Sequence, residues 1–110
     1  MSLLDDLLAD LTAEGDRLWS AVAGLDADGW ATPTPAAGWT VATQVAHLLW
    51  TDDVAVKAAT DKEAWDGVVF AAIDDPEGFV DTEAVRLART PDLLDRWADV
   101  LDDVLDKEIA

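Results

Sequence analysis

Apolar side chains recur at helical spacing along much of the chain. Near the N-terminus they follow the order Leu4, Leu8, Leu11, Leu18 and Val22. Near the C-terminus they follow the order Leu94, Trp97, Leu101 and Val104. Residues three and four positions apart share one face of an α-helix. No segment alternates polar and apolar residues as a half-buried strand would. The pattern therefore predicts an all-α chain.

Capping residues divide the first half of the chain into helices. Ser2 is a suitable N-cap for a first helix, which we expect to end near Gly24. A connector follows, in which Asp26 can cap a short turn through Trp30. Thr40 then suits the N-cap of a second long helix that reaches about residue 60.

Similar capping and proline signals divide the second half of the chain into helices. Asp61 can cap a third segment that ends near Ile73, and residues 81–88 form either a short helix or an irregular link. Pro91 after Thr90 predicts the start of the last helix, because proline suits the first helical position. In that helix, Asp103 and residue 107, a lysine, have the spacing of a weak ion pair. Three long helices and a short one predict an antiparallel helix bundle, organised as one domain over residues 1–110.

The second helix carries a third stripe between its apolar and solvated faces. Small and polar residues make up this stripe, which includes Gln44, His47 and Thr51 and is flanked by Trp50. Such a stripe is typical of a helix that lines a cavity. His47 is the one histidine of the chain. It is either a metal ligand or general base, or a histidine at the core edge that is satisfied by a hydrogen bond.

Asp52 lies about 140° around the same helix from His47, within the apolar arc, at 100° per residue. The two side chains therefore cannot hold one ion from that helix. If Asp52 is buried, it needs a partner, for which Arg17, Arg86 or an indole N–H are available. The alternative is an exposed acid near a helix end.

Composition narrows the classes of function. The chain has 110 residues, of which 51% are hydrophobic, and it contains six tryptophans and no cysteine. The absence of cysteine excludes thiolate metal sites and cysteine nucleophiles. Its 24 acidic and 7 basic residues give a net charge of -17, which disfavours nucleic acid and anionic membranes as partners. No apolar run is long enough for a membrane span and no basic leader is present, so we expect a cytoplasmic protein.

Residues 30–50 read WATPTPAAGWTVATQVAHLLW. This segment resembles the signature of the mycothiol-dependent maleylpyruvate isomerase N-terminal domain, a branch of the DinB-like metal-binding superfamily. The segment that follows is similar to an actinobacterial metal-binding sub-group, and the likeness runs along essentially the whole chain. The resemblance implies a four-helix bundle with a divalent metal, zinc or nickel, between its helices. It also implies that His47 is one metal ligand and that mycothiol or a similar low-molecular-weight thiol takes part in the reaction.

The resemblance implies further metal ligands on a fourth helix, which we expect these 110 residues to lack. Three helices would leave an apolar groove open, so we expect a homodimer or a partner that completes the bundle. Two functions follow. The first is a divalent-metal-binding domain of the thiol-dependent isomerase or transferase class, with Gln44, Trp50 and Thr51 lining its pocket. The second is a non-catalytic helical interaction or dimerisation module with a vestigial metal site. A third hypothesis, an acidic mimic of nucleic acid, rests on charge alone.

Overall fold

Six helices make up the chain in the computed structural model, which describes residues 2–105. They are α1 (Leu3–Val22), α2 (Ala27–Trp30), α3 (Val41–Thr60), α4 (Lys62–Asp74), α5 (Phe79–Ala88) and α6 (Leu93–Val104). Within the described residues there is no strand, only an isolated antiparallel bridge between Pro33 and Thr40. The predicted all-α class is confirmed. Six helices replace the expected three long ones and a short one, because the connector and the segment after Gly78 also form helices.

Side-chain caps explain why the first four helices begin where the sequence predicts. Ser2, Asp26 and Asp61 each accept a hydrogen bond from the backbone N–H three residues later, at 3.1, 2.8 and 3.1 Å. Thr40 and Thr43 form a reciprocal capping box at the start of α3. Each cap satisfies a backbone donor that the first helical turn leaves free.

The last two helices begin at positions that no local sequence signal predicts. α5 resolves the alternative at residues 81–88 in favour of a helix, and it starts at Phe79 without a side-chain cap. The predicted start of α6 at Thr90 and Pro91 is wrong. The Thr90 N–H still donates to Leu87 of α5, and Asp92 is left-handed with φ 57°, so α6 starts at the next residue. The predicted pair of Asp103 with residue 107 lies outside the described residues.

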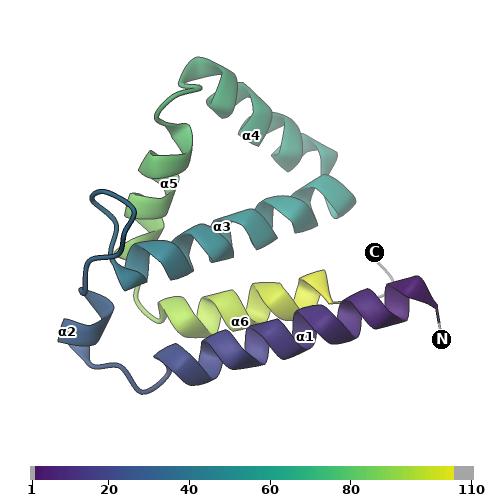
Figure 1. The fold of residues 1–110 in the computed structure, drawn as a ribbon. Coiled ribbons are helices and arrows are strands. Elements are labelled where there is room, and N and C mark those ends of the chain that lie inside the picture. The colour runs from purple at the N-terminus through teal and green to yellow at the C-terminus, as the bar shows by residue number, and fades with distance from the viewer. Residues whose placement is uncertain (1, 106–110) are drawn as a thin grey trace.

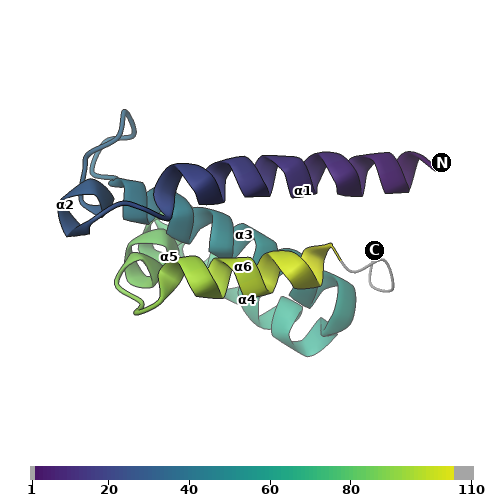
Figure 2. The same ribbon diagram turned by 90° about the horizontal axis from the view of Figure 1, so that it is seen from below.

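Helix α3 is the centre of the arrangement. It packs extensively against α4, α5 and α6. Figure 1 shows α3, α4 and α5 as the sides of a triangle, with α6 and α1 along the other side of α3. Figure 2, turned by 90°, shows α1 running above α6 along the length of the molecule. Among the described helices, α3 alone makes such contacts with three neighbours, so it positions the walls of any site between them.

The core lies where α3, α5 and α6 meet. Its buried members are Val45, Ala46, Leu49, Leu87, Leu93 and Trp97. Leu18 and Trp19 of α1 pack against this cluster. Gly15 lets α1 come close to α6, because a Cβ built there would lie 2.7 Å from Leu101 Cδ2. Helix α1 is therefore fixed to the core by its C-terminal half.

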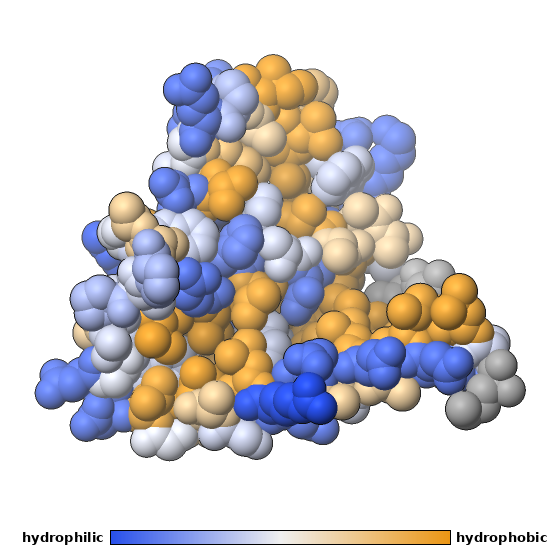
Figure 3. Space-filling view, in the orientation of Figure 1, coloured by the Kyte–Doolittle hydropathy of each residue, from blue (hydrophilic) through white to orange (hydrophobic). Residues whose placement is uncertain are grey.

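Large apolar side chains also remain on the surface. On α4, Phe70 is 71% and Ile73 68% exposed, and on α1 Leu3, Leu4, Leu7 and Leu11 are exposed. Figure 3 shows hydrophobic side chains gathered over α4 at the top of the view. In the part of the chain that is described, no helix is both long and apolar enough to cross a membrane.

Candidate functional site

The His47 ring lies between two indole rings near the start of α3. Its centroid is 5.4 Å from that of Trp39, with an interplanar angle of 56°. It is 6.1 Å from that of Trp50, with an angle of 21°, so these two rings are stacked. The Nδ1 atom is buried and has no hydrogen-bond partner among residues 2–105. Aromatic packing therefore holds the ring, and within residues 2–105 no hydrogen bond reaches Nδ1.

The connector before α3 brings Trp39 to His47. Gly38 adopts φ 77°, a conformation that favours glycine, and the Trp39 N–H donates to Ala36 O at 3.0 Å. The Trp39 indole N–H then donates to Asp81 Oδ1 of α5 at 2.9 Å. This bond ties the connector to a helix 42 positions further along the chain. Nothing in the sequence pattern marks Asp81, because its role arises only from tertiary packing.

The other polar residues of the predicted stripe hydrogen-bond to their surroundings. Gln44 Nε2 donates to Thr34 Oγ1 at 3.1 Å, which joins α3 to the connector. The Thr51 hydroxyl donates to Leu48 O, one turn back on its own helix, at 2.9 Å. Gln44 and Thr51 thus shape the helix near His47, and their contact with a ligand stays a prediction.

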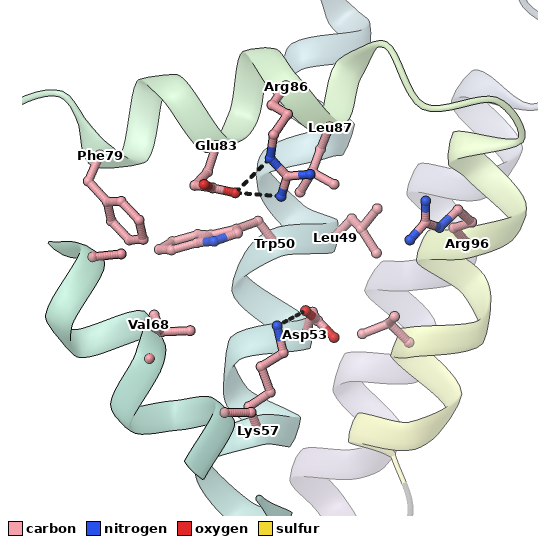
Figure 4. Close-up of a pocket in the computed structure, with 14 residues that line it drawn as sticks. Leu49, Trp50, Asp53, Lys57, Val68, Phe79, Glu83, Arg86, Leu87 and Arg96 are labelled. Carbon is pink, nitrogen blue, oxygen red and sulfur yellow. Dashed lines mark hydrogen bonds and ion pairs between the residues drawn. The ribbon is translucent and has the colours of Figure 1, made fainter. Parts of the chain in front are cut away.

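Trp50 has two neighbours besides the helix that carries it. It stacks on His47 and meets the Phe79 ring of α5 edge to face, with centroids 5.5 Å apart and an interplanar angle of 75°. It also lines a cavity between α3, α4, α5 and α6. Figure 4 shows Trp50 and Phe79 side by side at one side of this cavity. Trp50 therefore contacts both His47 and the cavity.

The residues present provide one nitrogen ligand for a metal and no complete ligand set. Among residues 2–105 no group of three or more His, Cys, Asp or Glu side chains is placed to hold one ion. A zinc site takes at least three protein ligands. The described residues alone therefore do not fit a complete metal site, and His47 needs ligands from elsewhere to form one.

The Asp52 side chain leaves α3 in a different direction from His47, as the helical geometry predicts. Its Oδ2 accepts a hydrogen bond of 3.1 Å from the indole N–H of Trp97 on α6. Burial raises the pKa of the Asp52 carboxyl, and the bond from Trp97 opposes this effect. Of the three partners predicted for a buried Asp52, this hydrogen bond confirms the indole N–H. Asp52 is thus a half-buried carboxyl that links α3 to α6.

Comparison with known proteins identifies the relatives of this chain. It is 51% identical over 92 residues to the uncharacterized protein Rv0036c of Mycobacterium tuberculosis strain H37Rv, and equally to the uncharacterized protein MT0041 of strain CDC 1551. Each match covers 82% of this chain and 36% of the relative, so the chain spans about a third of the length of these proteins. No solved structure matches it. The model of the mycothiol maleylpyruvate isomerase N-terminal domain matches residues 11–107, which include the connector, His47 and both indoles beside it. The chain therefore belongs to the mycothiol maleylpyruvate isomerase N-terminal domain family.

Proposed function

We propose that this domain binds a divalent metal ion, zinc or nickel, in part through His47, and serves an isomerase or transferase that uses a low-molecular-weight thiol such as mycothiol. The observation that carries the proposal is the buried Nδ1 of His47, which lacks a hydrogen-bond partner in the described chain. A buried polar atom without a partner costs about 1–3 kcal/mol and is rare in native proteins. A site that keeps such an atom is a good candidate for ligand binding.

The surroundings of His47 support the same proposal. Trp39 and Trp50 restrict the orientation of the imidazole, and neither indole donates a hydrogen bond to Nδ1. Family membership supports the thiol, because the family is named for a mycothiol-dependent isomerase. Thiols lose their proton when they coordinate a metal, so metal binding and thiol chemistry suit one site.

The remaining ligands must come from outside residues 2–105. The proposal assigns them to a second copy of the domain or to an additional helix that completes a four-helix bundle. The exposed apolar side chains of α1 and α4 support such a contact, because surfaces of this kind mark interfaces. In the longer relatives, about two-thirds of the protein lies outside the matched region and offers further candidates.

Metal content tests this proposal. The protein is stripped with a chelator, reloaded with zinc or nickel, desalted and measured by elemental analysis. We expect about one metal ion per chain, or about one per two chains if a symmetric dimer shares the site. His47→Gln keeps a polar side chain of similar size but provides no imidazole, and it should lose the metal.

Asp10→Asn is the matched control, because a chain of charge -17 also attracts cations without a specific site. Asp10 is exposed on α1, so this variant should keep the metal. Equal metal retention by wild type and His47→Gln would contradict the proposal, and so would no retention by either.

The second candidate is a non-catalytic interaction or dimerisation module. Phe70 and Ile73 favour it, because they lie three residues apart on α4 and both are largely exposed. Sedimentation velocity at increasing concentration tests this function with Phe70→Ser. A dimer that the substitution disrupts, in a protein that retains no metal, would favour the module over the metal site.

A further inference from the structure

A cavity of about 570 Å³ lies between α3, α4, α5 and α6, and Trp50 is part of its lining. Small-molecule sites in proteins commonly have volumes of roughly 300–1,000 Å³. Figure 4 shows side chains from four helices around this space. The cavity is thus of a size that suits a small organic ligand.

Part of the cavity lining is apolar. Leu49 and Leu87 are core residues, and Val68 and Val100 line the space beside them. Trp50 contributes an aromatic wall. A ligand in this part of the cavity would gain about 25 cal/mol for each Å² of apolar surface that it buries. These apolar side chains therefore favour a ligand with a hydrocarbon portion.

The lining of the cavity also concentrates positive charge. Of the seven basic residues in the chain, three line the cavity: Lys57, Arg86 and Arg96. Only two acidic residues, Asp53 and Glu83, line it with them, in a chain that has 24. The lining therefore has a net positive charge within a protein whose net charge is -17.

Arg96 is the cation that remains for a ligand. Lys57 pairs with Asp53 at 2.9 Å, and Arg86 pairs with Glu83 at 2.6 Å, each on its own helix. Arg96, on α6, makes no side-chain hydrogen bond or ion pair with the described residues. In Figure 4, Arg96 extends from α6 on the right of the view, and Arg86 extends from α5 at the top, next to Glu83. A guanidinium binds a carboxylate with two parallel hydrogen bonds.

We propose that this cavity binds an amphipathic monocarboxylate, whose hydrocarbon portion lies on Leu49, Leu87 and Trp50 and whose carboxylate pairs with Arg96. A lining that combines apolar side chains with a guanidinium lacking an ion pair in the described chain is what such a ligand requires. The proposal involves no metal and does not depend on the role of His47.

The test compares octanoate, octanol and octylammonium, which share one hydrocarbon chain and differ in charge. Binding to metal-free protein is followed by the indole N–H signals in a ¹⁵N-labelled sample. Trp50 lines this cavity, whereas Trp30, Trp19 and Trp97 line other pockets, so the signals report where the ligand binds. We expect saturable shifts centred on Trp50 and tighter binding of octanoate than of octanol or octylammonium. General attraction to an acidic protein would instead favour octylammonium.

Arg96→Gln should weaken octanoate binding about fivefold, which is the effect of losing one ion pair at a solvent-exposed position. Octanol binding should stay unchanged, which shows that the variant is folded. Arg89→Gln is the matched control, because it removes the same charge from an exposed residue that follows α5 and does not line the cavity. Equal losses in both variants, tighter binding of octylammonium than of octanoate, or shifts that bypass Trp50 would each overturn the proposal.

Discussion

The hydrogen bond from Trp97 to Asp52 predicts different effects for two substitutions at one position. Asp52→Ala removes the acceptor and leaves the indole N–H of Trp97 unpaired, in a side chain that is only 4% exposed. An unsatisfied buried donor costs about 1–3 kcal/mol. For a domain of this size, this corresponds to a fall in Tm of about 5 to 20 °C. Asp52→Asn keeps a carbonyl acceptor, removes the charge and should be at least as stable as wild type at neutral pH.

The sign of the pH dependence follows from the raised pKa of Asp52. The folded protein holds this proton more tightly than the unfolded chain, in which the pKa is about 3.9. The stability that protonated Asp52 contributes is therefore fully present below about pH 3.9 and is lost as pH rises through the folded pKa. The advantage of Asp52→Asn over wild type should thus grow as pH rises through this window and then level off.

Urea unfolding followed by circular dichroism gives the free energies of unfolding for wild type and both variants. Far-UV dichroism is preferable to fluorescence, because substitution at Asp52 changes the surroundings of Trp97 directly. Low protein concentration is needed near the pI of about 4.1, where the net charge vanishes. The reasoning is wrong if Asn destabilises as much as Ala, or if the difference between Asn and wild type does not vary with pH.

Two further substitutions test the packing of α1 and the start of α3. Gly15→Val places a side chain against Leu101, where even a Cβ would lie 2.7 Å from Cδ2, and should cost about 1–3 kcal/mol in thermal unfolding. Gly24→Val, whose Cβ would have no atom within 4 Å, should change stability by less than about 0.5 kcal/mol, and equal effects would contradict the close approach. Thr40→Ala breaks the capping box with Thr43 and should cost about 1 kcal/mol in the same assay, whereas Thr40→Ser should retain most of the stability.

Helix boundaries could be predicted where the signal is local. Ser2, Asp26, Thr40 and Asp61 each bond to a backbone N–H three positions later, so the sequence contains the complete interaction. The starts of α5 and α6 have no such bond. In particular, the left-handed Asp92 is a consequence of how the chain turns between two packed helices.

The candidate site was predictable only in part. The period of α3 separates His47 from Asp52 and places Trp50 beside the histidine, because these relations exist within one helix. The sequence also shows that a buried Asp52 needs a partner, but distances between helices decide that it is Trp97. The contact of Trp39 with His47 and the place of Arg96 in the cavity lining could not be predicted, because the connector and α6 reach their positions only in the folded chain.

Helix α4 is the weakest wall of the cavity. None of its side chains is completely buried, and α3 is the one described helix against which it packs extensively. Segments with few buried contacts unfold locally at a small fraction of the free energy of global unfolding. Transient opening of α4 therefore widens the access of solutes to the cavity while the core of α3, α5 and α6 stays intact. A ligand that binds only when α4 is in place reduces this opening by mass action, so occupancy and the order of α4 rise together.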